Sequence, residues 1–294
     1  MSRPPTDSRQ HSGQRRWPVV SITRDTPLRL FSAAAALLGL GLLLLIVFST
    51  LQGALAALPA LANILSSSNW APLSGQFGML AMITASLAAS LLALLLAAPL
   101  AILLAVWLAL YCPPRLQGSL RALYELMAGI PSVVYGLWGL ILLVPLISRL
   151  APPGANLLSA ALVLALMILP YGVLLIDSRL RSLPLSLRQA GLACGLSTWG
   201  CFRAIYWPLA RPGAVNAMIL QFGRALGETM AVLMVAGNVV QLPDSLLAPV
   251  RTLTANIALE MGYAADQHRA ALFLSGLLLL VMAMLLMWRR PEAA

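Results

Sequence analysis

The chain of 294 residues contains no lysine, because all 19 of its basic residues are arginine. A phosphate-binding P-loop places a lysine on the nucleotide phosphates, so this absence argues against an NTPase site in the chain itself. Charged residues are also scarce, at 10% of the chain against 60% hydrophobic residues, and the apolar residues come in long runs. This composition excludes an ordinary water-soluble globular domain.

Histidine, cysteine and acidic residues are too few or too scattered for a metal site or a catalytic centre. The two histidines are His11 and His268, and His268, next to Arg269, is interpreted as an interface residue. The three cysteines (Cys112, Cys194 and Cys201) lack the spacing of metal ligands or of a disulfide framework. The nine acidic residues are dispersed, without a Ser/His/Asp set or a carboxylate pair. We therefore expect no enzyme activity, metal or bound cofactor in this chain.

Six membrane spans are predicted from the apolar runs. They are Leu28–Leu51, Phe77–Tyr111, Ile130–Ile147, Ala155–Ile176, Gly213–Val240 and Arg269–Trp288. The second is longer than a bilayer requires, with a kink expected at Pro99, and Pro170 is expected to bend the fourth. Residues 1–27 are polar and predict a disordered basic tail before an uncleaved first span. The remainder, residues 28–290, is predicted to be one all-α membrane domain.

Arginine is distributed unevenly between the two sides of these spans. It is concentrated before the first span and after the second, fourth and sixth: Arg3, Arg9, Arg15, Arg16, Arg24, Arg29, Arg115, Arg121, Arg179, Arg181, Arg188, Arg203, Arg211, Arg289 and Arg290. Residues 52–76 carry no charge, and residues 241–267 are acidic on balance. The positive-inside rule then predicts that both termini and the loop of residues 177–211 lie in the cytoplasm. Because the arginines flank the spans and form no single face, nucleic-acid binding is not expected.

The loop of residues 177–211 is predicted to contain two short helices. Pro184 suits the first helical turn and Gly195 the stop, while Ser197 is a suitable cap for a second helix that should end before Pro208. The second helix has one apolar face: Trp199, Phe202 and Tyr206. That face can lie in a groove of a partner protein, or it can pack on the membrane domain or the lipid surface.

The spacing of this loop resembles the EAA loop of ABC importer permeases. The matching pattern is Gln189-Ala190-Gly191-x3-Gly195-x9-Ile205-x-Trp207-Pro208, against E-A-A-x3-G-x9-I-x-L-P in that family. The resemblance implies that the loop docks into a cleft of a separate ATPase subunit, which binds ATP and magnesium. The short helices of the loop then transmit the closure of that ATPase to the membrane helices. Gln189 replaces the Glu of the family, so an ion pair made by that Glu is replaced at most by a hydrogen bond.

Two longer stretches resemble phosphate-specific permeases of this class. They are residues 128–139 (AGIPSVVYGLWG) and residues 223–238 (GRALGETMAVLMVAGN), and the second is closer to the PstC-type subunit than to the PstA-type. The resemblance covers about residues 77–288 and implies the six-helix type I (MetI-like) permease fold in the bacterial inner membrane. It also implies three partners: an ATPase of PstB type, a second permease of PstA type and a periplasmic phosphate-binding protein of PstS type.

Arg224 and Glu228 are the charges expected inside the membrane, where ionised side chains usually face the bundle interior. Gln221, Arg224 and Glu228 are predicted to share one helical face. Arginine presents a planar fork of donors to a tetrahedral oxyanion, so Arg224 is our candidate for contact with phosphate. The alternative is an Arg224–Glu228 pair at i, i+4 that only neutralises itself. The two interpretations are compatible if Glu228 pairs with Arg224 while the path is empty and releases it when the anion arrives.

Other polar residues have competing interpretations. Gln221, Asn216 and Thr229 are typical of hydrogen bonds between membrane helices, and Gly223 and Gly227 form a G-x3-G that favours close helix approach. Ser132 follows Pro131, where amide donors at a helix start could meet an anion or where the serine is simply a cap.

Two other functions remain open from the sequence. Permeases for sulfate, molybdate or phosphonate share the loop pattern. A carrier driven by an ion gradient, or a membrane scaffold, belongs to a different class, but a carrier usually shows internal repeats, discontinuous helices or more intramembrane acids.

Overall fold

The computed structural model describes residues 26–150 and 152–288. The predicted tail, residues 1–27, lies almost wholly outside this part of the chain. The chain divides into two compact units, Met1–Val47 and Phe48–Ala294, which are described separately. In the first unit the described residues form most of helix α1 (Thr26–Ala54), and every side chain from Leu28 to Val47 is exposed.

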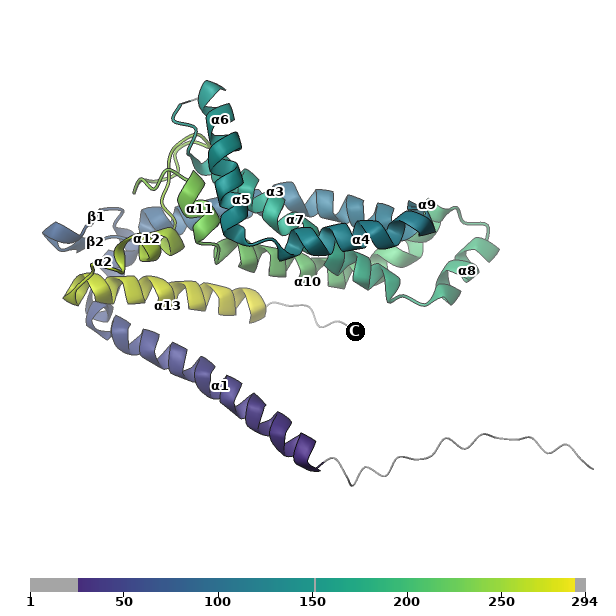
Figure 1. Cartoon of the computed structure of the whole chain (residues 1–294), viewed down its shortest axis with the longest axis horizontal. Coiled ribbons are helices and arrows are strands. Elements are labelled where there is room, and N and C mark those ends of the chain that lie inside the picture. The colour runs from purple at the N-terminus through teal and green to yellow at the C-terminus, as the bar shows by residue number, and fades with distance from the viewer. Residues whose placement is uncertain (1–25, 151, 289–294) are drawn as a thin grey trace, which may run out of the picture. The chain divides into compact units, whose positions relative to one another are not determined.

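The described part of the second unit consists of helices and one small hairpin (Figure 1). The α-helices after α1 are α2 (Leu61–Ser66), α3 (Leu80–Val106), α4 (Pro114–Gly129), α5 (Ser132–Trp138), α6 (Val144–Leu150), α7 (Leu157–Arg181), α8 (Leu185–Ala193), α9 (Thr198–Cys201), α10 (Trp207–Leu226), α11 (Met230–Val235), α12 (Leu253–Glu260) and α13 (Asp266–Trp288). Short 3₁₀ segments are η2 (Leu55–Ala60) and η3 (Pro72–Ser74), and π segments are η4 (Trp107–Tyr111), η5 (Gly139–Leu143) and η6 (Phe202–Tyr206). Strands β1 (Trp70–Ala71) and β2 (Gln76–Phe77) pair antiparallel.

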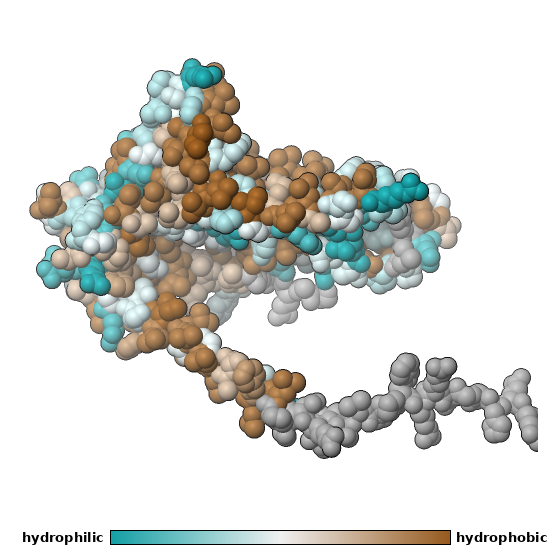
Figure 2. All heavy atoms as spheres, viewed as in Figure 1, coloured by the Kyte–Doolittle hydropathy of each residue, from teal (hydrophilic) through white to brown (hydrophobic). Residues whose placement is uncertain are grey.

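Five helical stretches of the described chain are long and apolar enough to cross a membrane. They are Leu28–Ser66, Leu80–Tyr111, Ser132–Leu150, Leu157–Arg181 and Asp266–Trp288, and they match five of the six predicted spans. Pro99 and Pro170 lie inside α3 and α7 without ending either helix. Apolar side chains cover one side of the α5 and α6 surface in this view, as expected for a surface that faces lipid or another apolar partner, whereas the tip of α6 is hydrophilic (Figure 2).

The fifth predicted span, Gly213–Val240, is not one helix. Helix α10 ends at Leu226, and α11 begins only at Met230 and ends at Val235, before an irregular segment. The interruption falls at Gly227, whose lack of a side chain lowers the helix propensity of this position. The prediction of one continuous span here is therefore wrong. The predictions also omitted α4 and α12.

Small residues on α3 set the centre of the bundle. Seven alanines recur at every fourth position and are at most 1% exposed: Ala81, Ala85, Ala89, Ala93, Ala97, Ala101 and Ala105. Neighbouring alanines of this set lie one above the other and form a row that winds slowly around α3; α7 packs closely on α3, and α10 packs against both helices (Figure 1). In a membrane, where lipid is as apolar as leucine, such small residues favour helix association by allowing backbones to approach closely.

A buried polar cluster joins the hairpin to the last two helices. The Glu260 carboxylate at the end of α12 accepts hydrogen bonds from Trp70 Nε1 at 2.8 Å and Arg251 Nη1 at 2.7 Å. It also lies 2.8 Å from Nε2 of His268 on α13. The His268 side chain is only 12% exposed. His268 lies in the first turn of α13, where Glu260 holds its ring, and its place at a membrane interface stays a prediction.

We predict that Ala93→Leu lowers the free energy of unfolding by about 1–3 kcal/mol, since the larger side chain must separate α3 from α7. Thermal unfolding of the purified protein in detergent, followed by tryptophan fluorescence, measures this change. Ala35→Leu is the matched control, because Ala35 lies exposed on α1. An equal effect of the two substitutions would contradict the close packing at Ala93.

Candidate functional site

The loop between α7 and α10 has the local structure that its sequence predicts at two points. Helix α8 ends in a Schellman motif, in which Leu196 N–H donates to Gly191 O and Gly195 N–H to Leu192 O. Gly195 has a φ of +78°, which glycine adopts without a steric penalty. The Ser197 side chain accepts a hydrogen bond from Gly200 N–H at 3.1 Å and caps α9. The predicted stop at Gly195 and cap at Ser197 are confirmed.

The second helix of the loop does not end before Pro208, as predicted. Helix α9 continues through η6 into α10, and Pro208 lies in the first turn of α10. The wider π turn of η6 changes which carbonyls lie opposite the proline ring, so the helix passes through Pro208 without the usual break.

Gly191 allows α8 to pack closely on the following segment. A methyl group built at Gly191 would lie 2.6 Å from Cys201 Sγ and 3.0 Å from Ile205 Cδ1, both too close for ordinary contact. Gly191 stands where the EAA pattern has its second alanine, and Cys201 and Ile205 fill the space that an alanine methyl group would need. This contact fixes the angle at which α8 leaves the bundle.

The remaining residues of the motif differ in exposure. Gln189 and Ala190 on α8 are exposed, as are Gly195 and Pro208, whereas Ile205 is half-buried. The exposed surface of the motif is therefore largely that of α8 and its C-terminal turn. Helix α8 lies at one end of the three-helix core formed by α3, α7 and α10 (Figure 1).

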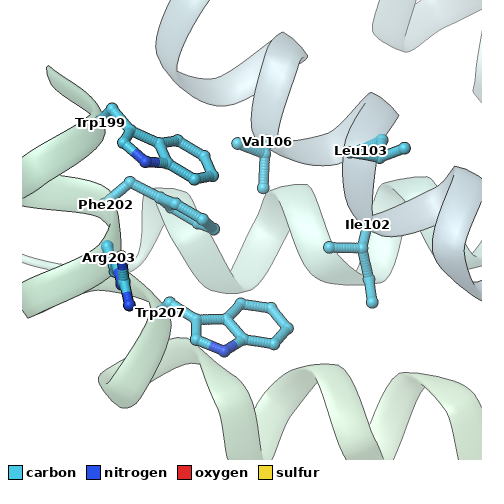
Figure 3. Close-up of a pocket in the computed structure, with 7 residues that line it drawn as sticks. All are labelled: Ile102, Leu103, Val106, Trp199, Phe202, Arg203 and Trp207. Atoms are coloured by element: carbon cyan, nitrogen blue, oxygen red, sulfur yellow. The ribbon is translucent and has the colours of Figure 1, made fainter.

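The apolar face of the second helix packs mainly on the bundle. Phe202 and Tyr206 are 7% and 6% exposed, and only Trp199 is largely exposed. Trp199, Phe202 and Trp207 line a groove of about 350 Å³ against Ile102, Leu103 and Val106 of α3, with Arg203 at its edge (Figure 3). Of the two readings of this face, packing against the membrane domain describes it better than projection toward a partner.

An ion-pair cluster fixes the end of α7 that leads into this loop. Asp177 is fully buried and accepts two hydrogen bonds from Arg121 on α4, from Nε at 2.8 Å and Nη2 at 3.3 Å. Arg181, one turn further along α7, lies 3.0 Å from the same carboxylate. The hydrogen bond to Asp177 raises the pKa of Arg121 above its ordinary value, although partial burial lowers it. No local pattern predicts this contact, because Arg121 and Asp177 are 56 positions apart.

Arg224 and Glu228 lie on opposite sides of the helix interruption. The Arg224 guanidinium carbon lies 5.8 Å from the centroid of the Tyr171 ring. Glu228 Oε1 instead accepts a hydrogen bond from Ala231 N–H at 3.3 Å, in the first turn of α11. Within the described residues no ion pair joins Arg224 to Glu228. The predicted common helical face is wrong for Glu228, because the α-helix ends at Leu226.

This arrangement places each charge where a helix end favours it. Arg224 lies in the last turn of α10, near the partial negative charge of that C-terminus. The Glu228 carboxylate bonds an amide at the start of α11, near a partial positive charge. The Glu228 carbonyl also accepts a hydrogen bond from Thr254 Oγ1 at 2.8 Å, which joins the interruption to α12.

Gln221 lies inside the helix packing. It is fully buried, and its Nε2 donates to the carbonyl of Ile168 on α7 at 3.0 Å. Gly172 provides the space, since a side chain there would overlap the Gln221 amide. The structure therefore confirms the predicted role of Gln221 as a hydrogen-bonding residue between two helices.

Ser132 and the G-x3-G glycines lie elsewhere on the surface of the second unit. Ser132 begins α5 and is half-buried, but the residue at the capping position is Pro131, and no side-chain capping bond is present there. A Cβ built on Gly223 meets no atom of the described chain within 4 Å. The predicted close approach of a helix to Gly223 therefore does not occur within this part of the chain.

We predict that Arg121→Gln lowers the free energy of unfolding by about 3 kcal/mol, since it removes one partner of a buried ion pair. Arg181→Gln should cost less than about 1 kcal/mol, because the Arg181 side chain is 50% exposed. The two variants lose the same charge beside the same carboxylate, so each is a control for the other. Thermal unfolding in detergent measures both, and equal losses would contradict the assignment of Arg121 as the main partner.

The chain matches the family model for binding-protein-dependent transport system inner membrane components over residues 101–289. It is 34% identical to the phosphate transport system permease protein PstC of Mesorhizobium japonicum, over 92% of this chain and 93% of that protein. It is also 35% identical to the probable ABC transporter permease protein YqgH of Bacillus subtilis, over 76% of this chain and 74% of that protein.

The similarity extends to solved structures at the level of the fold. An inward-facing structure of the MetNI methionine ABC transporter superposes with a TM-score of 0.59 and 18% identity, covering 75% of this chain and 95% of that chain. The type I, MetI-like permease fold is thereby confirmed. By these matches the chain belongs to the family of inner membrane components of binding-protein-dependent transport systems.

Proposed function

We propose that this chain is the PstC-type permease subunit of an ATP-driven importer that moves inorganic phosphate across the bacterial inner membrane by alternating access. The observation that carries the proposal is the match to PstC of Mesorhizobium japonicum along nearly the whole chain. A single permease chain forms half of such a pathway. The other parts are a PstA-like permease, a PstB-like ATPase that binds ATP and magnesium, and a PstS-like periplasmic phosphate-binding protein.

The orientation follows from the arginine distribution. Both termini, the basic tail of residues 1–27 and the loop of residues 177–211 face the cytoplasm in this proposal. The permease domain is residues 28–290, with residues 77–288 as its core. Gly223 presents open space that a helix of the companion permease would fill, since glycine there permits close backbone approach.

The interrupted helix is the proposed substrate path. Discontinuous helices with charged residues at their ends recur where membrane transporters bind ions. Arg224 is exposed at such an end and offers a planar donor fork to the anion. The Glu228 carboxylate is held by its hydrogen bond from Ala231 N–H of α11. One turn before Arg224, the Gln221 amide bonds the Ile168 carbonyl and joins α10 to α7. Ser132, half-buried at the start of α5, is a further candidate along the path.

The exposed part of the loop is the proposed contact with the ATPase. Gln189 and Ala190 lie outward on α8, and Gly191, Gly195, Ile205 and Pro208 shape the helices that carry them. The loop begins at Asp177, which Arg121 ties to α4. Movement of α8 by the ATPase would therefore reach α7 and α4 together.

In proteoliposomes containing the full importer complex, we expect ATP-dependent uptake of radiolabelled phosphate that excess sulfate or molybdate does not inhibit. Arg224→Gln should reduce uptake at least about tenfold, since a charge-assisted contact to the anion is lost. Arg115→Gln removes the same charge from an exposed position on α4 and should leave uptake unchanged. Normal uptake by an assembled Arg224→Gln complex would remove Arg224 from the path, and efficient inhibition by sulfate would overturn the choice of phosphate.

Gly191→Ala should reduce ATP-driven uptake several-fold, because the new methyl group displaces α8 from its position on Cys201. Cys201→Ala removes the atom that the methyl group meets, so the double variant should recover most of the activity. Uptake and ATP hydrolysis are measured on the same proteoliposomes. A double variant no better than Gly191→Ala would show that the angle of α8 does not govern coupling.

A further inference from the structure

A pocket lined partly by polar residues lies between α7 and α10, where α7 leads into the proposed coupling loop. Its volume is about 360 Å³. The polar residues that line it are Ser178, Arg179 and Ser182 on α7 and Asn216 on α10. Leucine and alanine side chains form the rest of the wall. None of these four polar residues belongs to the coupling motif, and only Asn216 lies on the interrupted helix.

The pocket continues the face that carries Arg224. Helices α7 and α10 pack side by side, and Arg224 lies over Tyr171 at one end of their contact. Arg179 lies eight positions after Tyr171 on α7, and Asn216 lies eight positions before Arg224 on α10. Both residues line the pocket. At 1.5 Å per residue, both shifts correspond to about 12 Å along the helices. Arg224 and Arg179 therefore lie at two different heights along the contact between α7 and α10.

The close approach of α10 shapes the pocket around Arg179. The stem of Arg179 lies on Gly213, where a built Cβ would be 2.9 Å from Arg179 Cδ and would displace it. Ser182 donates its hydroxyl to the Arg179 carbonyl at 2.8 Å. The residues with side-chain hydrogen-bond donors that line the pocket besides Ser182 are Arg179, Ser178 and Asn216.

The local charge balance favours an anion. Asp177, two positions before Arg179 on α7, accepts from Arg121 and Arg181. These two arginines together with Arg179 give three positive charges against one negative charge, a net charge of +2. The C-terminus of α7 contributes only about half a negative charge, so the arginines outweigh it. Guanidinium, hydroxyl and amide donors are also the groups that bind tetrahedral oxyanions.

We propose that this pocket is a second oxyanion subsite, in which Arg179 binds a phosphate group before it leaves toward the coupling-loop side of the bundle. As an exit site for transported phosphate, it rests on the proposed function. The same donors would also bind the phosphate of a phospholipid headgroup, because the pocket lies at an end of the membrane helices. Both ligands share one chemistry, a tetrahedral phosphate bound by Arg179.

The test uses the complete importer in proteoliposomes and measures the initial rate of phosphate uptake against external phosphate concentration. Arg179→Gln should lower the maximal rate about tenfold, since it removes a charge-assisted contact. The half-saturating external concentration should stay unchanged, because capture of phosphate outside does not involve this pocket. Arg179→Lys should recover part of the rate, and Arg115→Gln is the control for loss of one positive charge.

Asn216→Asp is the second variant, and it keeps the proposal testable if Arg179→Gln does not assemble. Its carboxylate would pair with Arg179 in place of the anion, so the maximal rate should again fall about tenfold. If assembled Arg179→Gln and Asn216→Asp complexes match the control, the subsite is wrong. If the wild-type complex takes up no phosphate, the proposed function fails instead, so the two failures are distinguishable.

Vesicle composition separates the two sources of phosphate. The rates of wild type and Arg179→Gln are compared in phosphatidylcholine alone and in phosphatidylcholine with phosphatidylglycerol. A deficit of the same size in both indicates that Arg179 binds the transported anion. If wild type is faster than Arg179→Gln only in vesicles with phosphatidylglycerol, and the two rates are equal in phosphatidylcholine alone, the pocket binds a lipid headgroup. No deficit in either lipid overturns the subsite.

Discussion

The close packing of α3 against α7 is the constraint on which the rest of this structure depends. The seven alanines of α3 present no side chain beyond a methyl group, so the two helices meet along their length. Gly172 continues this pattern toward α10, where it makes room for the buried amide of Gln221. Once the three helices are in contact, the polar groups that they carry are brought to fixed positions, among them Arg224 over Tyr171 and Arg179 beside Asn216.

The ionised groups of the bundle are held in two different ways. At the interruption between α10 and α11, Arg224 and Glu228 each lie at the helix end whose partial charge opposes their own. At the end of α7, by contrast, Asp177 is buried among arginines and is stabilised by direct ion pairs. The first arrangement leaves Arg224 open to a ligand, whereas the second ties α4 to the loop that we propose contacts the ATPase.

Local features of the structure could be predicted from the sequence, and contacts between distant residues could not. Gly195 and Ser197 act on residues within one turn of themselves, so the end of α8 and the start of α9 followed from residue type. The span at Gly213–Val240 was wrong, because apolar composition does not reveal where a helix stops inside the membrane. The π turn before Pro208 and the contact between His268 and Glu260 were also missed, since both depend on groups outside the local pattern.

The sequence by itself determined that this is a helical membrane protein without its own P-loop, and where most of its spans lie, because hydrophobic run length and residue type act locally. Its motif spacing also predicted the permease family that the comparisons confirm. Only the tertiary structure decided that Arg121 pairs with Asp177, that Gly191 faces Cys201, and that Arg179 and Asn216 share a pocket. These pairings depend on which helix faces meet, and that is set by the packing of α3, α7 and α10 as a whole.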